Sequence, residues 1–304
     1  MSLIESALAK LRRTAETTPR PAFAPARIIG ATPAPKAPAL KGPALVVAPE
    51  PEEERLRRRI VIDETALRRG GYLPEEGLER RFADHYRRIK RPLIEKAASG
   101  GAEARLIMVS SALPGDGKTF TSINLALSMA RERDVSVLLI DADAPKSRIS
   151  EVFGLRGEPG LVDALADESL DVESLIVGTN VRGLAILPAG RFVEHATELL
   201  ASARMEQIAA RLAARHPLRL SLFDSAPLLV SSEARVLLRI AGQVVLVVRV
   251  DVTPRQAALN AAGHVDKTKL RGIILNHVPF KNGGGYYGYG TYEEEGGKAR
   301  VAVK

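Results

Sequence analysis

Residues 106–119 read Leu-Ile-Met-Val-Ser-Ser-Ala-Leu-Pro-Gly-Asp-Gly-Lys-Thr, an apolar run that leads into a glycine-rich turn. The turn, Ala112 to Thr119, matches the pattern G-x-x-x-x-G-K-S/T, with alanine in the first glycine position. This pattern requires a strand before it and a helix after it, and the flanking residues suit both, with the helix expected over 118–131. The stretch therefore predicts a phosphate-binding loop (P-loop).

The residue types of this loop suit a bound nucleotide. Its glycines would let the backbone wrap the phosphates with N–H groups, and the helix that follows adds positive potential at its N-terminus. Lys118 would reach the β- and γ-phosphates, and Thr119 would offer a hydroxyl to Mg²⁺. The predicted nucleotide contacts are Gly115, Asp116, Gly117, Lys118, Thr119 and Phe120. The loop therefore predicts binding of ATP together with Mg²⁺.

Two further apolar runs end in carboxylates. Asp141 and Asp143 end the run 137–143, and Asp224 ends the run 220–224. A lone strand-end aspartate is often only a helix cap, but ligands of parallel α/β sheets lie at the carboxyl ends of the strands. We therefore expect the three acids to converge on the P-loop, where Mg²⁺ prefers carboxylate oxygens. The predicted metal residues are Thr119, Asp141, Asp143 and Asp224, and the predicted catalytic residues are Lys118, Asp141, Asp143 and Asp224.

From Arg105 onward, short apolar strands alternate with helices, which predicts an α/β fold. The expected strands are 106–110, 135–141, 184–187, 220–224, 244–250 and 272–275. The expected helices between them are 194–215, 232–239 and 254–262. This alternation is typical of a mainly parallel sheet flanked by helices on both faces, as in P-loop NTPases.

The chain divides into five predicted segments. An amphipathic helix over 1–14 and a Pro/Ala-rich linker over 15–59 precede a helical segment over 60–101, whose main helix is expected over 74–98. The P-loop domain follows over 102–280, and a Gly/Tyr-rich tail over 281–304 carries Tyr286, Tyr287, Tyr289 and Tyr292. The linker and the tail lack the apolar periodicity of a core, so we expect both to be disordered.

Composition excludes several classes of protein. The chain has no cysteine, so it has neither disulfides nor thiolate metal sites, and its five histidines show no metal-ligand spacing. No apolar run approaches the roughly 20 residues of a membrane span, and charges interrupt the start of the chain where a signal peptide would be apolar. Residues 1–105 hold 21 Lys/Arg against 14 Asp/Glu, which suits an anionic partner or a solvated linker equally well. We expect a cytoplasmic protein.

Two features narrow the class of P-loop protein. The run ending Asp141-Ala-Asp143, known as Walker A′, belongs to the MinD/ParA-like ATPases and to the bacterial tyrosine kinases. MinD/ParA-like proteins carry a lysine in the second P-loop position, where this chain has Leu113, whereas Pro114 resembles the tyrosine kinases. The tail resembles the autophosphorylated tyrosine cluster of these kinases. The chain therefore resembles the bacterial tyrosine kinases.

The resemblance covers most of the chain except the Pro/Ala linker. The matching stretches are 111–126, 137–143, 187–190, 223–227, 247–249 and 272–276, and 1–12 and 86–93 resemble the autokinases of exosortase-linked exopolysaccharide systems. It implies a tyrosine kinase that phosphorylates its own tail tyrosines in trans and regulates exopolysaccharide chain length or export. It also implies a Wzz-like membrane protein as partner, which recruits the chain to the inner face of the cell membrane. Nucleic acid is not an expected partner.

The resemblance also implies a ring-shaped homo-oligomer. Family members form rings through a helix carrying Glu-x-x-Arg-x-x-Arg, and the matching residues here are Asp84, Arg87 and Lys90. Lysine lacks the bidentate fork of arginine, so the ring contacts are expected to be weaker or differently arranged. A plain charged helix face is the alternative interpretation.

Three functions remain open at this point. A tyrosine autokinase leads, a MinD/ParA-like positioning ATPase comes second, and a binding adaptor with a decayed nucleotide site comes third. In the kinase, Asp141 or Asp143 would accept the tyrosine proton and Asp224 would orient a magnesium-bound water. The sequence does not separate the two candidate bases.

Overall fold

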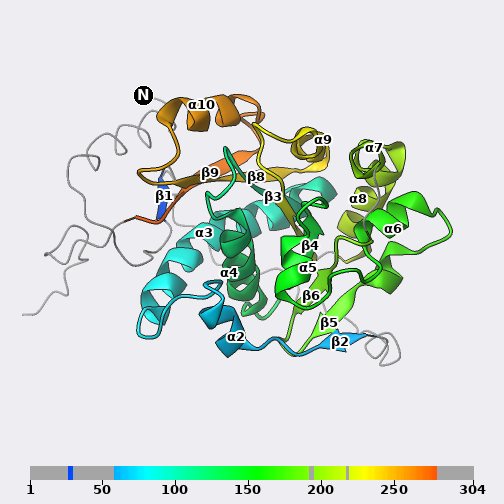
Figure 1. Ribbon diagram of the computed structural model, residues 1–304, viewed down its shortest axis with the longest axis horizontal. Coiled ribbons are helices and arrows are strands. Elements are labelled where there is room, and N and C mark those ends of the chain that lie inside the picture. Colours follow the sequence, from blue (N-terminus) through cyan, green and yellow to red (C-terminus); the bar gives the residue numbers. More distant parts are fainter. Residues whose placement is uncertain (1–26, 30–57, 192–194, 217–218, 279–304) are drawn as a thin grey trace, which may run out of the picture.

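The structure, a computed structural model, describes residues 27–29, 58–191, 195–216 and 219–278, and their strands form one nine-stranded sheet (Figure 1). The strand order is β1-β9-β8-β3-β7-β4-β6-β5-β2. The strands are β1 (Arg27–Ile29), β2 (Arg59–Ile60), β3 (Leu106–Ser111), β4 (Ser136–Ala142), β5 (Val177–Thr179), β6 (Leu184–Leu187), β7 (Arg219–Ser225), β8 (Gln243–Arg249) and β9 (Leu270–Asn276). The P-loop strand β3 therefore lies near the centre, between β8 and β7.

The predicted mainly parallel α/β sheet is confirmed, and its antiparallel pairs lie toward the two edges. All pairs from β9 to β6 are parallel, whereas β1 runs antiparallel to β9 and β5 runs antiparallel to β6. In the pairing of β4 with β7, Asp141 lies opposite Asp224. The parallel register therefore brings the predicted acids together at the carboxyl ends of the strands.

Helices cover both faces of the sheet. They are α2 (Glu64–Arg69), α3 (Glu79–Ser99), α4 (Lys118–Ala130), α5 (Arg148–Val152), α6 (Leu161–Ala166), α7 (Ala196–Leu200), α8 (Ala203–Arg215), α9 (Ser232–Ile240) and α10 (Arg255–Gly263), with 3₁₀ turns η2 (Ala102–Arg105) and η3 (Val172–Leu175). Buried side chains of α2 to α5 form a core with one face, and those of α6 to α10 form a core with the other.

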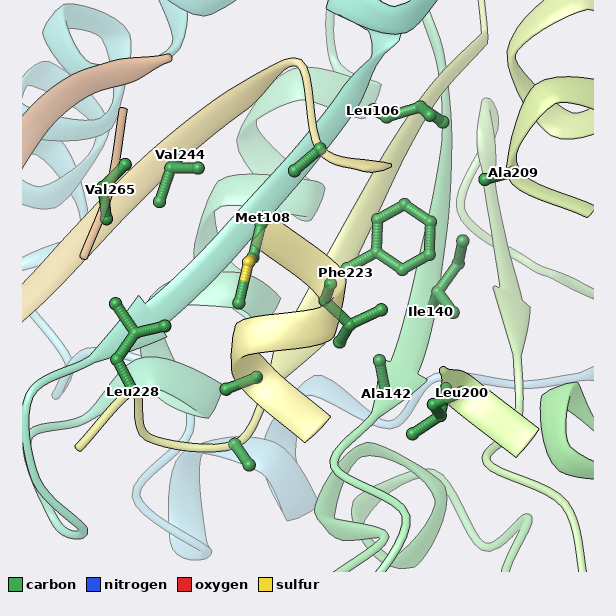
Figure 2. Close-up of a cluster of buried hydrophobic side chains, with 14 of the residues drawn as sticks. Leu106, Met108, Ile140, Ala142, Leu200, Ala209, Phe223, Leu228, Val244 and Val265 are labelled. Carbon is green, nitrogen blue, oxygen red and sulfur yellow. The ribbon is translucent and has the colours of Figure 1, made fainter. Parts of the chain in front are cut away.

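The second core, covered by α6 to α10, contains the large buried side chains Met108 and Phe223 of the strands. Figure 2 shows Met108, Phe223 and Ile140 side by side, as their pairing in β3, β7 and β4 requires. Leu200 and Ala209 reach this layer from the helices that cover it. Burial of such side chains contributes roughly 1.5–3 kcal/mol each, so the strands that end at the P-loop and at the acids are held firmly.

Several element boundaries differ from the predicted ones. The helix expected over 194–215 is two helices, because Ser202 adopts an extended backbone at the N-cap position of α8. The helix expected from residue 74 begins at Glu79, after a turn in which Gly77 has φ 86° and donates to the Glu79 carboxylate. The short elements α2, α5, α6 and β5 were not predicted, although Asp63 caps α2 by accepting from two N–H groups, a sequence signal that was available.

Three predicted segments concern residues beyond those described. The amphipathic helix 1–14, nearly all of the linker 15–59 and the tail 281–304 with its tyrosines lie there. The segment 60–101 is described, and its helix α3 buries Phe82, Tyr86 and Leu93 in the core that it shares with α4. Among the described residues, none of the helices combines the length and the hydropathy of a membrane span.

Candidate active site

The P-loop connects β3 to α4 with the backbone geometry that a phosphate cradle needs. Gly115 and Gly117 have φ of 85° and 95°, in the left-handed region that favours glycine. A Cβ on Gly117 would lie 1.9 Å from the side-chain nitrogen of Asn276, so no larger residue fits there. Gly117 is also the N-cap of α4, which points the first free N–H groups of that helix at the loop.

Asp116 ties the loop to the neighbouring strands. Its buried carboxylate accepts from the Leu113 N–H at 3.0 Å and from the Thr253 hydroxyl at 2.5 Å, and its carbonyl accepts from the Asn276 side chain at 3.0 Å. Burial raises the pKa of Asp116, although the bonds from Thr253 and Leu113 oppose the rise. Asp116 was predicted as a nucleotide contact, and the structure gives its side chain the task of shaping the loop.

Lys118 lies among the three predicted acids. Its ammonium group is 3.0 Å from a carboxylate oxygen of Asp143, and both side chains are largely buried. Burial would lower the pKa of Lys118, but the charges of Asp224, Asp143 and Asp141 outweigh it and the pKa is raised. The structure thus brings together all four residues that were predicted as catalytic, with the lysine firmly protonated.

Asp224 and Thr119 meet directly. The Thr119 hydroxyl donates to one carboxylate oxygen of Asp224 at 2.8 Å, and the Ser122 hydroxyl, one helical turn later, donates to the other at 2.9 Å. Burial raises the pKa of Asp224 despite Lys118 and these two hydroxyls. Ser122 was not predicted, because its role depends on the phase of α4 and not on the loop pattern.

Asp141 is held from one side only. Ser150, which α5 places behind it, donates both its N–H and its hydroxyl to the same oxygen Oδ2, each at 2.7 Å. The other oxygen, Oδ1, is buried and accepts no hydrogen bond from the described residues. Burial raises the pKa of Asp141 to about 7 against the bonds from Ser150. One oxygen therefore stays available for a proton or a cation, and no sequence signal had pointed to Ser150.

The donor set fits a hydrated Mg²⁺ better than a cage made of protein ligands alone. Among the described residues, no group of three or more His, Cys, Asp or Glu side chains has metal-binding geometry. Three buried carboxylates and the Thr119 hydroxyl nevertheless gather beside the loop, and one of their oxygens lacks a partner within the described chain. Mg²⁺ often binds through one or two carboxylates, nucleotide phosphates and water, and this arrangement suits it.

Phe120 faces away from the loop. Its ring packs edge-on against Phe82 of α3 with the ring centroids 6.0 Å apart. Only its backbone is therefore placed to serve as the predicted nucleotide contact, while its side chain fixes α4 against α3.

The predicted oligomerisation residues divide between the two sides of α3. Asp84 and Arg87 are exposed and form an ion pair with each other at 2.8 Å. Lys90 is buried, and its ammonium group donates to the Ser128 carbonyl of α4 at 2.5 Å and pairs with Glu132, just after α4, at 2.6 Å. Two of the three residues are thus free to face a neighbouring subunit, and Lys90 is engaged within the chain.

Comparison with known proteins gives consistent matches. The family described as AAA domain matches residues 104–261. The tyrosine-protein kinase YwqD of Bacillus subtilis is 32% identical over 211 residues, which are 69% of this chain and 86% of that protein. The tyrosine-protein kinase wzc of Salmonella typhimurium is 31% identical over 64% of this chain but only 27% of its own length, so this chain spans about a quarter of it.

A solved structure adds the same likeness in three dimensions. The kinase domain of the Escherichia coli tyrosine kinase ETK is 25% identical and superposes with a TM-score of 0.59. The match covers 75% of this chain and 99% of that domain. The fold, the P-loop and the relatives therefore all indicate the same family.

Proposed function

Because this chain belongs to the bacterial tyrosine-protein kinase family, we propose that it transfers the γ-phosphate of ATP to Tyr286, Tyr287, Tyr289 and Tyr292 of its own tail, chiefly from one subunit to another. One observation carries this proposal. Lys118, Thr119 and the three buried aspartates meet at the P-loop, and Asp141 keeps one oxygen without a partner among the described residues.

Lys118 and the loop amides would hold the phosphates and neutralise the charge that develops on the transferred group. Mg²⁺, held by the Thr119 hydroxyl, the phosphates and the carboxylates of Asp141, Asp143 and Asp224 directly or through water, would neutralise phosphate charge when bound. Positioning and electrostatic stabilisation are the main contributions of the protein to phosphoryl transfer.

The tyrosine hydroxyl needs a proton acceptor, since the pKa of a free tyrosine is about 10. Its oxygen would attack the γ-phosphorus, the bond to the β–γ bridging oxygen would break, and ADP would leave. The phenolic proton would pass to a carboxylate. The geometry supports Asp141 for this role over Asp143, because Asp143 pairs with Lys118 and Oδ1 of Asp141 has no described partner.

Assembly and location follow from the same family resemblance. Asp84 and Arg87, exposed on α3, are the proposed contacts of a ring-shaped homo-oligomer. A Wzz-like membrane protein is the proposed partner, and it would bring this cytoplasmic chain to the inner face of the cell membrane. Regulation of exopolysaccharide chain length or export is the proposed outcome.

The test is incubation of the purified full chain with ATP labelled at the γ-phosphate. The proposal expects label on the full chain and none on a chain truncated after Phe280. Hydrolysis of ATP without labelling of the full chain would instead identify a positioning ATPase of the MinD/ParA type. Absence of both hydrolysis and labelling would identify an adaptor with a decayed site.

A further inference from the structure

We propose that Arg191 selects the acceptor by binding the carboxylates that follow Tyr292 in the tail of a second copy of this chain. This inference rests on the proposed autokinase function and deepens it, because it makes an acidic tyrosine segment the preferred substrate. It also assigns an order, since Glu293, Glu294 and Glu295 follow Tyr292 directly, whereas tyrosine or glycine directly follows the other three tail tyrosines.

Arg191 is exposed, yet a buried acid holds it. The side chain of Arg191 is 65% exposed and that of Asp163 is 7% exposed, and Nε of the arginine donates to Asp163 Oδ1 at 2.6 Å. The second oxygen of Asp163 accepts from the N–H groups of Arg191 and Gly160 at 3.0 and 2.9 Å. A carboxylate removed from water at a cost thus holds one surface arginine through its side chain and its backbone, and also accepts from the N-cap residue of α6.

The guanidinium keeps its outer edge available. Its Nη groups make no hydrogen bond within the part of the chain that the structure describes. Two Nη groups side by side match the two oxygens of a carboxylate, which gives a bidentate pair. Because Nε is already bonded, less side-chain freedom is lost when an acidic residue binds.

The loop that carries Arg191 is fixed on α6. The Leu161 N–H donates to the Pro188 carbonyl and the Val162 N–H to the Ala189 carbonyl, each at 2.9 Å. A Cβ on Gly160 would lie 2.1 Å from the Pro188 carbonyl oxygen, so the two segments touch backbone to backbone. Arg191 therefore projects from a rigid support.

The same loop adjoins the proposed base. Leu187 pairs with Ile140 in the parallel sheet, so the residues after each strand run along the same edge. The Ala189 N–H donates at 2.9 Å to the Ser150 hydroxyl, which donates to Asp141 at 2.7 Å. Arg191 lies two residues farther on, at most about 7 Å along the chain, so a glutamate one to three residues beyond an acceptor tyrosine is within reach.

Charge at this edge favours an acidic segment. Lys146 and Arg148 are exposed on the turn and helix that follow Asp143, and Ser150 of the same helix bonds the loop of Arg191. Arg148 is partly neutralised by Glu151 at 2.9 Å. The three acids near Lys118 are buried, so the exposed side chains named at this rim are mainly cationic, and a segment bearing three glutamates complements them.

The experiment compares two acceptor chains, both inactivated by Lys118→Met. One keeps Glu293 to Glu295 and the other carries glutamine at these three positions. The enzyme is the full chain with its four tail tyrosines changed to phenylalanine, so every phosphotyrosine found in a tail belongs to an acceptor. The rate at Tyr292, followed by mass spectrometry at low ionic strength, is expected to be about tenfold higher for the glutamate acceptor.

Variants of the enzyme locate the effect. Arg191→Gln is expected to remove the preference for the glutamate acceptor while leaving the KM for ATP unchanged. Arg182→Gln is the matched control, an exposed arginine in the turn before β6 at the opposite edge of the sheet, and it should keep the full preference. Arg191→Glu should reverse the preference toward an acceptor with lysine at 293–295, a gain that loss of folding cannot produce.

Equal rates for both acceptors with the unaltered Arg191 enzyme would overturn the inference and leave the proposed kinase function standing. A preference that persists in Arg191→Gln would overturn it as well. If no acceptor gains phosphotyrosine and the wild-type chain does not label itself, the proposed function fails and the inference falls with it.

Discussion

The ammonium group of Lys118 lies 3.0 Å from a carboxylate oxygen of Asp143, within a cluster of charges that also includes Asp141 and Asp224. These charges raise the pKa of the lysine, so it is fully protonated near neutral pH. A nucleotide phosphate would therefore meet a preformed cation at the N-terminus of α4. Because Asp143 is paired with the lysine, Asp141, whose Oδ1 has no partner among the described residues, is the acid that can accept a proton.

Replacement of Lys118 by methionine is expected to abolish phosphotyrosine formation. Methionine is similar in length but carries no charge, so the phosphate loses its cation and Asp143 loses its partner. We expect the rate to fall by at least about 100-fold, as for other losses of a group that stabilises the transition state. Phosphotyrosine measured by immunoblot and mass spectrometry gives the readout, and circular dichroism confirms folding. Phosphotyrosine retained on the pure variant would contradict this role.

Replacement of Asp141 by asparagine is expected to raise stability while removing activity. The pKa of Asp141 is about 7 in the folded chain and about 3.9 in an unfolded one. Between these values the folded chain keeps a proton that the unfolded chain has lost, so the free energy of unfolding falls as pH rises from about 4 to 7. Asparagine carries no charge to desolvate, so the variant escapes this loss.

The thermal midpoint of Asp141→Asn, measured in EDTA, should therefore exceed that of the wild type at pH 8, and by less at pH 5. Kinase activity of the variant should fall by about 100-fold or more, the usual range for a lost general base. A gain in midpoint that is the same at both pH values would show that Asp141 is not a buried acid with a raised pKa.

Replacement of Thr253 by valine is expected to weaken ATP binding. The Thr253 hydroxyl donates to Asp116 at 2.5 Å, and its loss leaves a buried carboxylate with one fewer partner. The free energy of unfolding should fall by about 1–3 kcal/mol, and the Kd for ATP, measured by calorimetry, should rise several-fold as the loop loosens.

Thr179→Val is the matched control for that variant. Its hydroxyl is also buried and donates to two carbonyls, at the edge of the sheet away from the P-loop. It should lose comparable stability and keep its affinity for ATP. If Thr253→Val bound ATP with the same affinity as Thr179→Val, the Thr253–Asp116 bond would contribute to stability and not to ATP binding.

Replacement of Lys90 by methionine is expected to affect stability more than assembly. The buried Lys90 ammonium joins α3 to α4 through Ser128 and Glu132, so its loss should cost about 1–3 kcal/mol in urea unfolding. Asp84→Ala and Arg87→Ala remove an exposed pair, so they should change stability by less than about 0.5 kcal/mol and lower the mass seen in sedimentation. A lower mass for Lys90→Met, with an unchanged mass for Asp84→Ala and Arg87→Ala, would place Lys90 at the subunit contact.

The sequence predicts the centre of the site well because local patterns encode it. The P-loop needs only a strand, a turn and a helix in succession, and the acids follow strands whose parallel arrangement forces their ends together. The antiparallel strands β1 and β5, at and next to the two edges of the sheet, are not predictable this way, since each has three residues and depends on its neighbour for pairing. Such short pieces carry little pattern of their own.

The supporting residues escape sequence reasoning for a different reason. Asp116 meets Thr253 and Asn276, which are 137 and 160 residues away along the chain, and no local spacing marks such pairs. The orientation of Lys90 was available from the sequence, because it lies four residues after Tyr86 and three before Leu93 on the apolar stripe of α3.

The central claim is that phosphate passes from the P-loop of one subunit to the tail of another. Its most direct measurement mixes a full chain carrying Lys118→Met with an active chain whose four tail tyrosines are phenylalanine, and maps phosphotyrosine by tandem mass spectrometry after addition of ATP and Mg²⁺. We predict phosphate on Tyr286, Tyr287, Tyr289 or Tyr292 of the Lys118→Met chain, with Tyr292 modified first. Consumption of ATP with that tail unmodified would contradict the account.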